Sequence, residues 1–130
     1  MIRSASIFLV FCFAALSAGA HHSGAMFDRS KTYELVGTVI EYRFVAPHSW
    51  ISVLAQVDGK GEAERWDVES VTAGRMRLQG VTPANLRKGD KIKMLINPLR
   101  DGRHGASLLE LTLADGTKMR NNTSLLQVGQ

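Results

Sequence analysis

The chain has 130 residues and a formal net charge of +4, with 16 Lys+Arg against 12 Asp+Glu. Charges of both signs are mixed along the sequence, and no basic stripe carries interleaved aromatic residues, which argues against a nucleic-acid partner. The single cysteine, Cys12, lies in an apolar N-terminal segment that we expect to be removed. The mature protein is therefore expected to lack disulfides, cysteine-ligated zinc and thiol nucleophiles.

Residues 1–20 have the pattern of a cleaved secretory signal peptide. A positive charge at Arg3 precedes an apolar run over 7–16, and small residues then lead to Ala18 and Ala20. The alternative is an uncleaved membrane anchor, but an apolar run of about ten residues is too short to cross a bilayer as a helix. We therefore expect a periplasmic or secreted protein of about 110 residues, forming one domain with no membrane span.

The remaining chain has a β-type pattern. Residues 21–32 are polar and are predicted to form an extended N-terminal arm. A hairpin turn is predicted at Asp58-Gly59, and a short helix with Ser70 as its N-cap is predicted over 70–79. Residues 121–130 are predicted to be a flexible tail. Alternating apolar and polar residues predict strands over 33–45, 49–57, 62–69, 91–96 and 107–113.

The order of these elements indicates a fold. Three strands, a short helical crossing and two further strands are the order of a five-stranded OB-type barrel. We therefore predict an all-β, OB-like barrel over residues 33–120, with one short helix between the third and fourth strands. Another small β-sandwich or an open barrel is the alternative.

The histidines are the most informative side chains. All four lie beyond the predicted signal peptide, at His21, His22, His48 and His104. His21 and His22 stand at the predicted mature N-terminus, where the α-amino nitrogen and an imidazole are both available near neutral pH. Nitrogen-rich sites favour Cu(II) among the first-row divalent ions. The sequence therefore predicts a copper site, with His48 and His104 as further candidate ligands. The alternatives are a solvated N-terminal arm and structural roles for His48 and His104.

The cleavage position decides the geometry of such a site. Cleavage after Ala20 makes His21 the first residue, so that its amine and its ring chelate one metal ion. Cleavage after Gly19 leaves Ala20-His21-His22, in which the amine, two backbone amides and an imidazole form a square-planar site. The sequence permits both cuts, and we favour the first.

Other polar residues provide no convincing catalytic constellation, and we expect the protein not to be an enzyme. Glu69 ends a predicted strand and is a candidate acceptor for a histidine N–H beside the metal. The alternative function is an interaction or ligand-binding module, or an accessory subunit of a larger enzyme. In that case Trp50, Trp66 and Phe44 would stack on a sugar or peptide at the face of the barrel.

Several short motifs lie along the chain: His21-His22-Ser23, Met26-Phe27-Asp28, Gly37-Thr38-Val39, Pro47-His48, Trp66 with Glu69-Ser70, Leu86-x-x-Gly89-Asp90 and Pro98-x-x-Asp101-Gly102. Taken together, these motifs resemble a family of small exported bacterial proteins of uncharacterised function. The resemblance covers almost the whole mature chain and implies a periplasmic β domain without implying an activity. The chain departs from the family pattern at Ala46, Val71 and Val81, where the family has asparagine, proline and an aromatic residue.

Overall fold

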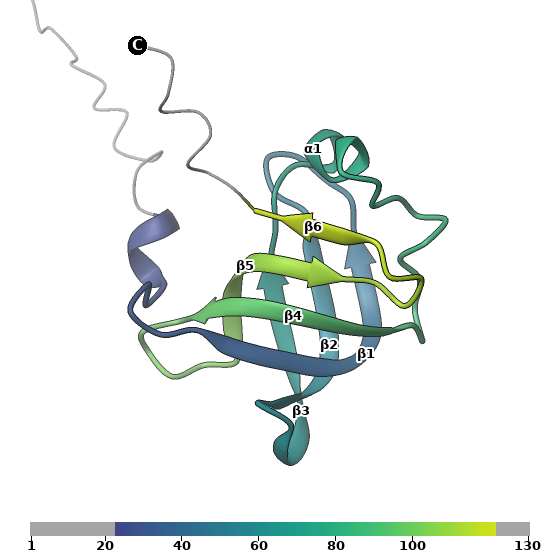
Figure 1. Cartoon of the computed structure of the whole chain (residues 1–130). Coiled ribbons are helices and arrows are strands. Elements are labelled where there is room, and N and C mark those ends of the chain that lie inside the picture. Colours follow the sequence, from purple (N-terminus) through teal and green to yellow (C-terminus); the bar gives the residue numbers. More distant parts are fainter. Residues whose placement is uncertain (1–22, 122–130) are drawn as a thin grey trace, which may run out of the picture.

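The computed structural model describes residues 23–121 of the chain (Figure 1). This part contains six strands, one short α-helix and one 3-10 helix, joined by loops. The predicted signal peptide, His21, His22 and most of the predicted tail lie outside these residues. The elements are η1 (Ser23–Met26), β1 (Tyr33–Arg43), β2 (Trp50–Val57), β3 (Lys60–Glu69), α1 (Ala73–Leu78), β4 (Lys91–Pro98), β5 (Gly105–Thr112) and β6 (Lys118–Arg120). No helix among them is long and apolar enough to span a membrane.

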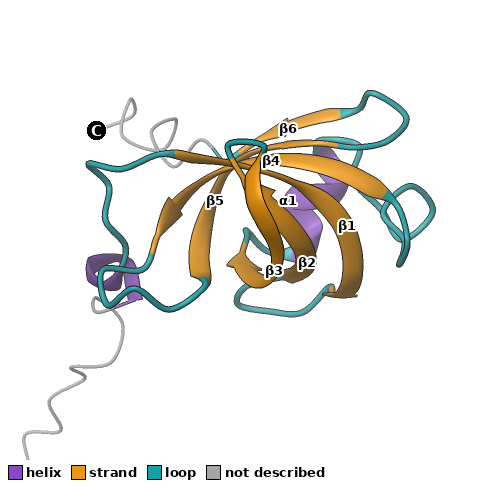
Figure 2. Ribbon diagram, turned by 90° about the horizontal axis from the view of Figure 1, so that it is seen from below, coloured by secondary structure: helices purple, strands orange, loops and turns teal. Residues whose placement is uncertain are grey.

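The strands form a closed barrel, as Figure 2 shows. Their order is β3-β2-β1-β4-β5-β6, and all of these neighbours are antiparallel. A parallel pairing of β3 with β5 closes the five-stranded barrel, while β6 adds only to the outer side of β5. The prediction of an all-β, five-stranded, OB-like barrel with one short helix is therefore confirmed.

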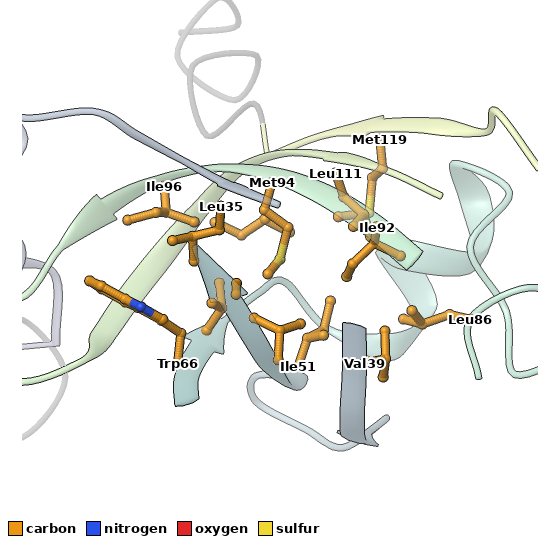
Figure 3. Close-up of a cluster of buried hydrophobic side chains, with 14 of the residues drawn as sticks. Leu35, Val39, Ile51, Trp66, Leu86, Ile92, Met94, Ile96, Leu111 and Met119 are labelled. Carbon is orange, nitrogen blue, oxygen red and sulfur yellow. The ribbon is translucent and has the colours of Figure 1, made fainter. Parts of the chain in front are cut away.

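The core follows from the alternation of side chains along the strands. Leu35 and Val39 of β1 are buried, and the position between them is Gly37, which is paired with Ala55 of β2. Figure 3 shows the buried side chains converging from several strands, with Trp66 at one side of the cluster. Met76 of α1 is also fully buried, so the helix is packed against the barrel.

The predicted hairpin turn is present between β2 and β3. Asp58 and Gly59 have φ values of 52° and 67°, the left-handed conformation that a tight hairpin turn requires. The Asp58 carboxylate accepts a hydrogen bond from the backbone N–H of Glu34 at 3.0 Å, which ties the turn to β1.

Three local predictions differ from the structure. The helix begins at Ala73 with Thr72 as its N-cap, because the Thr72 hydroxyl accepts from Arg75 N–H while Ser70 N–H is bonded to the carbonyl of Ser49. Strand β6 was not predicted, since three residues carry no detectable periodicity. Residues 23–26 of the expected extended arm form η1, and the arm then packs against the barrel through the buried Phe27.

Candidate functional site

Two cavities lie beside β3, on the outer side of the barrel. Trp66 and Val68 of β3 are buried in the core, whereas Asp67 and Glu69 alternate with them and are partly exposed. Asp67 contributes to one cavity and Glu69 to the other. The outward-facing residues of β3 therefore reach both cavities, one residue to each.

The two cavities are named here after the histidine that each contains. The His48 cavity has a volume of about 280 Å³ and is lined by Gly24, Phe27, Arg29, Pro47, His48, Glu69, Ser70, Val71, Thr72, Arg75, Asn97, Ser107 and Asn121. The His104 cavity has a volume of about 460 Å³ and is lined by Met26, Phe27, Trp50, Arg65, Asp67, Leu99, Arg103, His104, Gly105 and Ala106.

The loop between β1 and β2 positions His48. Ser49, the next residue, is buried and fixed by the backbone on both sides, because its N–H donates to Val71 O and its carbonyl accepts from Ser70 N–H. The Ala46–Pro47 peptide bond before His48 is cis. His48 is thereby held beside the end of β3, next to Glu69 and Ser70.

The imidazole of His48 is oriented by two oxygen acceptors. Its Nδ1 lies 3.2 Å from Glu69 Oε1 and 3.3 Å from the carbonyl oxygen of Ser70. Because neither oxygen donates a proton, Nδ1 carries the N–H and donates it, so Nε2 of the neutral ring keeps its lone pair. The Glu69 side chain is only 12% exposed against 44% for His48, so the more buried carboxylate contacts the Nδ1 edge of the more exposed ring.

His104 has a different environment. Its ring stacks on the indole of Trp66, with centroids 4.9 Å apart and an interplanar angle of 23°, and its Nε2 lies 3.3 Å from Glu64 Oε2. Its carbonyl accepts a hydrogen bond from Asp67 N–H at the junction of β3 and the β4–β5 loop. The structure thus places His48 and His104 in separate cavities.

The two tryptophans lie in different environments. Trp66 is only 5% exposed and belongs to the core, and its indole Nε1–H has no hydrogen-bond partner within residues 23–121. Trp50 lines the His104 cavity from β2. Phe44 is partly buried against the core and packs edge-on to Tyr42. Of the three aromatic residues proposed to stack on a ligand, Trp50 is the one that reaches a cavity.

The N-terminal segment lies between the cavities. Phe27 lines both of them and forms an isolated β-bridge with Leu99. Asp28 then fixes the segment, because its N–H donates to Pro98 O and its carboxylate accepts from the Ser30 hydroxyl at 2.6 Å. The Ser30 hydrogen bond is the main reason that the pKa of Asp28 lies below its ordinary value.

Within the described residues, no group of three or more histidine, cysteine, aspartate or glutamate side chains is placed to hold a metal ion. His21 and His22 are not among those residues. Gly24, however, lines the His48 cavity, so the described chain begins beside His48 and Glu69.

Sequence reasoning missed the arginines of the two cavities. Arg29 and Arg75 line the His48 cavity, while Arg65 and Arg103 line the His104 cavity. None of them belongs to a local motif, because each cavity is assembled from segments far apart in the chain. The signal that could have pointed to Arg103 is its position next to His104 in the loop before the fifth strand.

No curated protein and no solved structure matches the chain. One protein-family model does match, over residues 9–108, which is most of the chain. That model describes a family of unknown function, and its match takes in both the His48–Glu69 pair and the loop that carries His104. The chain with this barrel and these two cavities belongs to the family of unknown function DUF6152.

Proposed function

We propose that the chain is an exported copper-binding protein, with Nε2 of His48 as one ligand of Cu(II). The observation that best supports this proposal is that His48 Nδ1 lies 3.2 Å from Glu69 Oε1 and 3.3 Å from the carbonyl oxygen of Ser70. Metal-binding histidines nearly always donate their second ring N–H to a carboxylate or a backbone carbonyl, which fixes the ring and raises the basicity of the ligating nitrogen. Both kinds of acceptor are present here.

The N-terminal histidines would supply the other nitrogen ligands. His22 is two residues from Gly24, so its Cα lies within two Cα–Cα steps, each about 3.8 Å, of a residue that lines the His48 cavity. With signal cleavage after Ala20, the amine and ring of His21 would be available at the same place. The proposal thereby joins the N-terminal pair to His48, and it leaves His104 outside the site.

The charges of the cavity bear on which metal it would take. Glu69 is its one carboxylate among the described lining residues, whereas Arg29 and Arg75 are cationic. Ca²⁺ and Mg²⁺ are bound by several oxygen ligands, usually including carboxylates. A cavity of this composition would therefore discriminate against them and bind a metal that prefers nitrogen ligands, which is the behaviour of Cu(II).

The first test is a Cu(II) titration under chelator competition. The protein would be exported and processed by its own signal peptide, and its intact mass would be recorded on the same sample. We expect one Cu(II) per chain and a mass that begins at His21, with no comparable binding of Ca²⁺ or Mg²⁺. A mass that begins at Ala20 would instead assign the square-planar amine and amide geometry.

A set of single substitutions tests the ligands. We expect His21→Ala and His48→Ala to weaken Cu(II) binding strongly, and Glu69→Gln to weaken it roughly 10- to 100-fold, as changes to a supporting acceptor typically do. His104→Ala is the matched control, because it removes a histidine that also has a glutamate partner but lies in the other cavity. If His21→Ala and His48→Ala bind Cu(II) as tightly as the parent, the proposed site is wrong.

A further inference from the structure

The His104 cavity has the composition of a second, separate binding site. Met26, Phe27 and Leu99 give it apolar walls, Trp50 adds an aromatic surface, and charged groups stand around it. Its volume of about 460 Å³ is within the range of small-molecule sites, which combine an apolar lining with a few placed polar groups. Of its described lining residues, only Phe27 also lines the His48 cavity, and none is a proposed copper ligand.

The shape of the cavity depends on Gly105. A Cβ at this position would lie 2.5 Å from Leu99 Cδ1, so any side chain would displace Leu99, which itself lines the cavity. His104 is held by its stacking on Trp66 and its contact with Glu64. The walls on this side are thus fixed by packing.

One acidic group in the cavity is already neutralised. Asp67 Oδ1 accepts from Ser52 Oγ at 2.5 Å, and from Arg65 Nε and Nη2 at 3.3 and 3.2 Å. The Asp67 carboxylate and the Arg65 guanidinium therefore form an ion pair on the outer surface of β2 and β3. Arg103 is paired in the same way with Asp101, at 2.8 Å, so an anion would be received by the donors that its guanidinium leaves free and not by an excess of positive charge.

Arg103 is oriented for an anion. Its backbone N–H donates to Asp101 Oδ1 at 3.0 Å, and its Nε donates to Asp101 Oδ2 at 2.8 Å. Within residues 23–121 no hydrogen bond occupies its two Nη groups, and its side chain is 73% exposed. A guanidinium anchored through Nε presents its remaining N–H donors in a fixed plane, the arrangement that binds a carboxylate through two hydrogen bonds.

We infer that the His104 cavity binds a small ring-bearing carboxylate, with the carboxylate on Arg103 and the ring against Trp50 and the apolar walls. Arg65 is paired with Asp67 and Arg103 with Asp101, so the preference for an acid comes from the Nη groups of Arg103, which carry no hydrogen bond within residues 23–121. Both a sugar acid and an aromatic acid have this chemistry, because either ring can stack on an indole while its carboxylate pairs with arginine.

The probes are D-glucuronate and 4-hydroxybenzoate, titrated calorimetrically into the processed full-length protein without copper. D-glucose and 4-hydroxybenzamide are the uncharged counterparts. We expect at least one acid to bind with a stoichiometry of one per chain, and its uncharged counterpart to bind at least tenfold more weakly. The acid that binds shows whether the natural ligand is a sugar acid or an aromatic acid. The inference is overturned if neither acid binds, or if the uncharged counterparts bind equally well.

Substitutions then locate the site. We expect Arg103→Gln and Trp50→Leu each to weaken binding of the acid about tenfold or more, since a charge-assisted hydrogen bond or a ring contact is lost. Arg87→Gln is the matched control, because Arg87 is an exposed arginine next to one aspartate, Asp90, and lines neither cavity. His48→Ala should leave acid binding unchanged, which separates this site from the copper site. Unchanged affinity in both Arg103→Gln and Trp50→Leu overturns the assignment.

Discussion

Gly37 and Gly74 show how differently the same residue is used within one chain. At Gly37, in β1, an added Cβ would lie 2.6 Å from the Cα of Ala55 and would press on the backbone carbonyl of Leu54. At Gly74, in α1, an added Cβ would meet nothing within 4 Å. The first glycine is required by the close approach of β1 and β2, whereas the second only lowers the helix propensity of its segment.

Alanine substitution should therefore have opposite effects at the two positions. We expect Gly37→Ala to lower the free energy of unfolding by about 1–3 kcal/mol or more, because the β1–β2 backbones must move apart. We expect Gly74→Ala to raise it by up to about 1 kcal/mol. Urea denaturation of both variants measures the difference, and an equal loss of stability in the two would contradict this account of Gly37.

Individual residues also show how much of the candidate site could be predicted from the sequence. Glu69 was identified as an acceptor for a histidine N–H because it ends a strand, and the structure places it 3.2 Å from His48 Nδ1. Asp67 and Glu69 alternate with the buried Trp66 and Val68 along β3 and therefore share its outward face. The separation of His48 from His104 could not be predicted, since it depends on which loops meet around β3.

Among the elements, the N-terminal segment has the least regular structure and the most specific anchoring. Predicted as an extended arm, it forms η1 and is then fixed by Phe27 and Asp28. Arg100 also holds this segment: its Nε donates a hydrogen bond to the carbonyl of Ala25 at 3.1 Å, and its backbone N–H donates to the carbonyl of Met26. Such side-chain contacts between distant segments give no periodic signal, which is why sequence pattern alone missed them.

Acid should loosen this segment. The hydrogen bond from the Ser30 hydroxyl is the main cause that lowers the pKa of Asp28 from its ordinary value of 3.8, and Arg100 and Lys31 lower it further. A carboxyl whose pKa is depressed by folding stabilises the native state above its unfolded pKa, and this contribution is lost as the pH falls through the lower, native pKa. We therefore expect residues 25–31 to remain ordered at neutral pH and to lose protection below pH 3.8.

Hydrogen exchange of the Ser30 amide, whose N–H donates to Asp28 Oδ1, measures this effect when it is corrected for intrinsic rates and followed from about pH 5 to about pH 2.5, on both sides of the ordinary pKa of an aspartate. Asp28→Asn should give low protection with little pH dependence across that range. Asp115→Asn is the control, because Asp115 also has a lowered pKa but lies in the turn before β6. A Ser30 amide that stays equally protected at both ends of the range in the parent protein would contradict the role given to Asp28.

At the scale of the whole molecule, the parallel pairing of β3 and β5 is the shortest of the strand pairings that close the barrel. It has three register pairs, Asp67 with Gly105, Val68 with Ala106 and Glu69 with Ser107. The antiparallel β1–β2 pairing runs from Leu35–Val57 to Arg43–Trp50. Both cavities border the β3–β5 pairing, so their walls depend on the shortest strand pairing of the five-stranded barrel.

Hydrogen exchange under native conditions should resolve this difference. We expect the interstrand amides of the β3–β5 pairing to have protection factors at least about tenfold lower than those between β1 and β2, because short pairings open in local fluctuations. The Arg103→Gln protein is the comparison, because this substitution changes a side chain of the His104 cavity and leaves the residues of both strand pairings as they are. Equal protection across the barrel would mean that it opens only by global unfolding.

The overall architecture was the most predictable feature. Five strands and a helical crossing between the third and fourth determine the OB-like order, because each strand has a clear alternation. The closing β3–β5 pairing follows from that topology, although no local pattern in either strand indicates it. β6 escaped prediction because its one buried residue, Met119, has no periodic neighbours.

Gly24 and Asn121, from the first and last parts of the described chain, line the same cavity, and this has a practical consequence for anyone who labels or immobilises the protein. A polyhistidine tag joined close to Gly24 or Asn121 would bring competing imidazoles near His48, and, under the copper proposal, a tag that remains on the processed N-terminus would also remove the free amine required of His21. The Asp58-Gly59 turn lines neither cavity. It is therefore the place for an epitope or fluorophore that leaves both ends of the protein in their native chemical state.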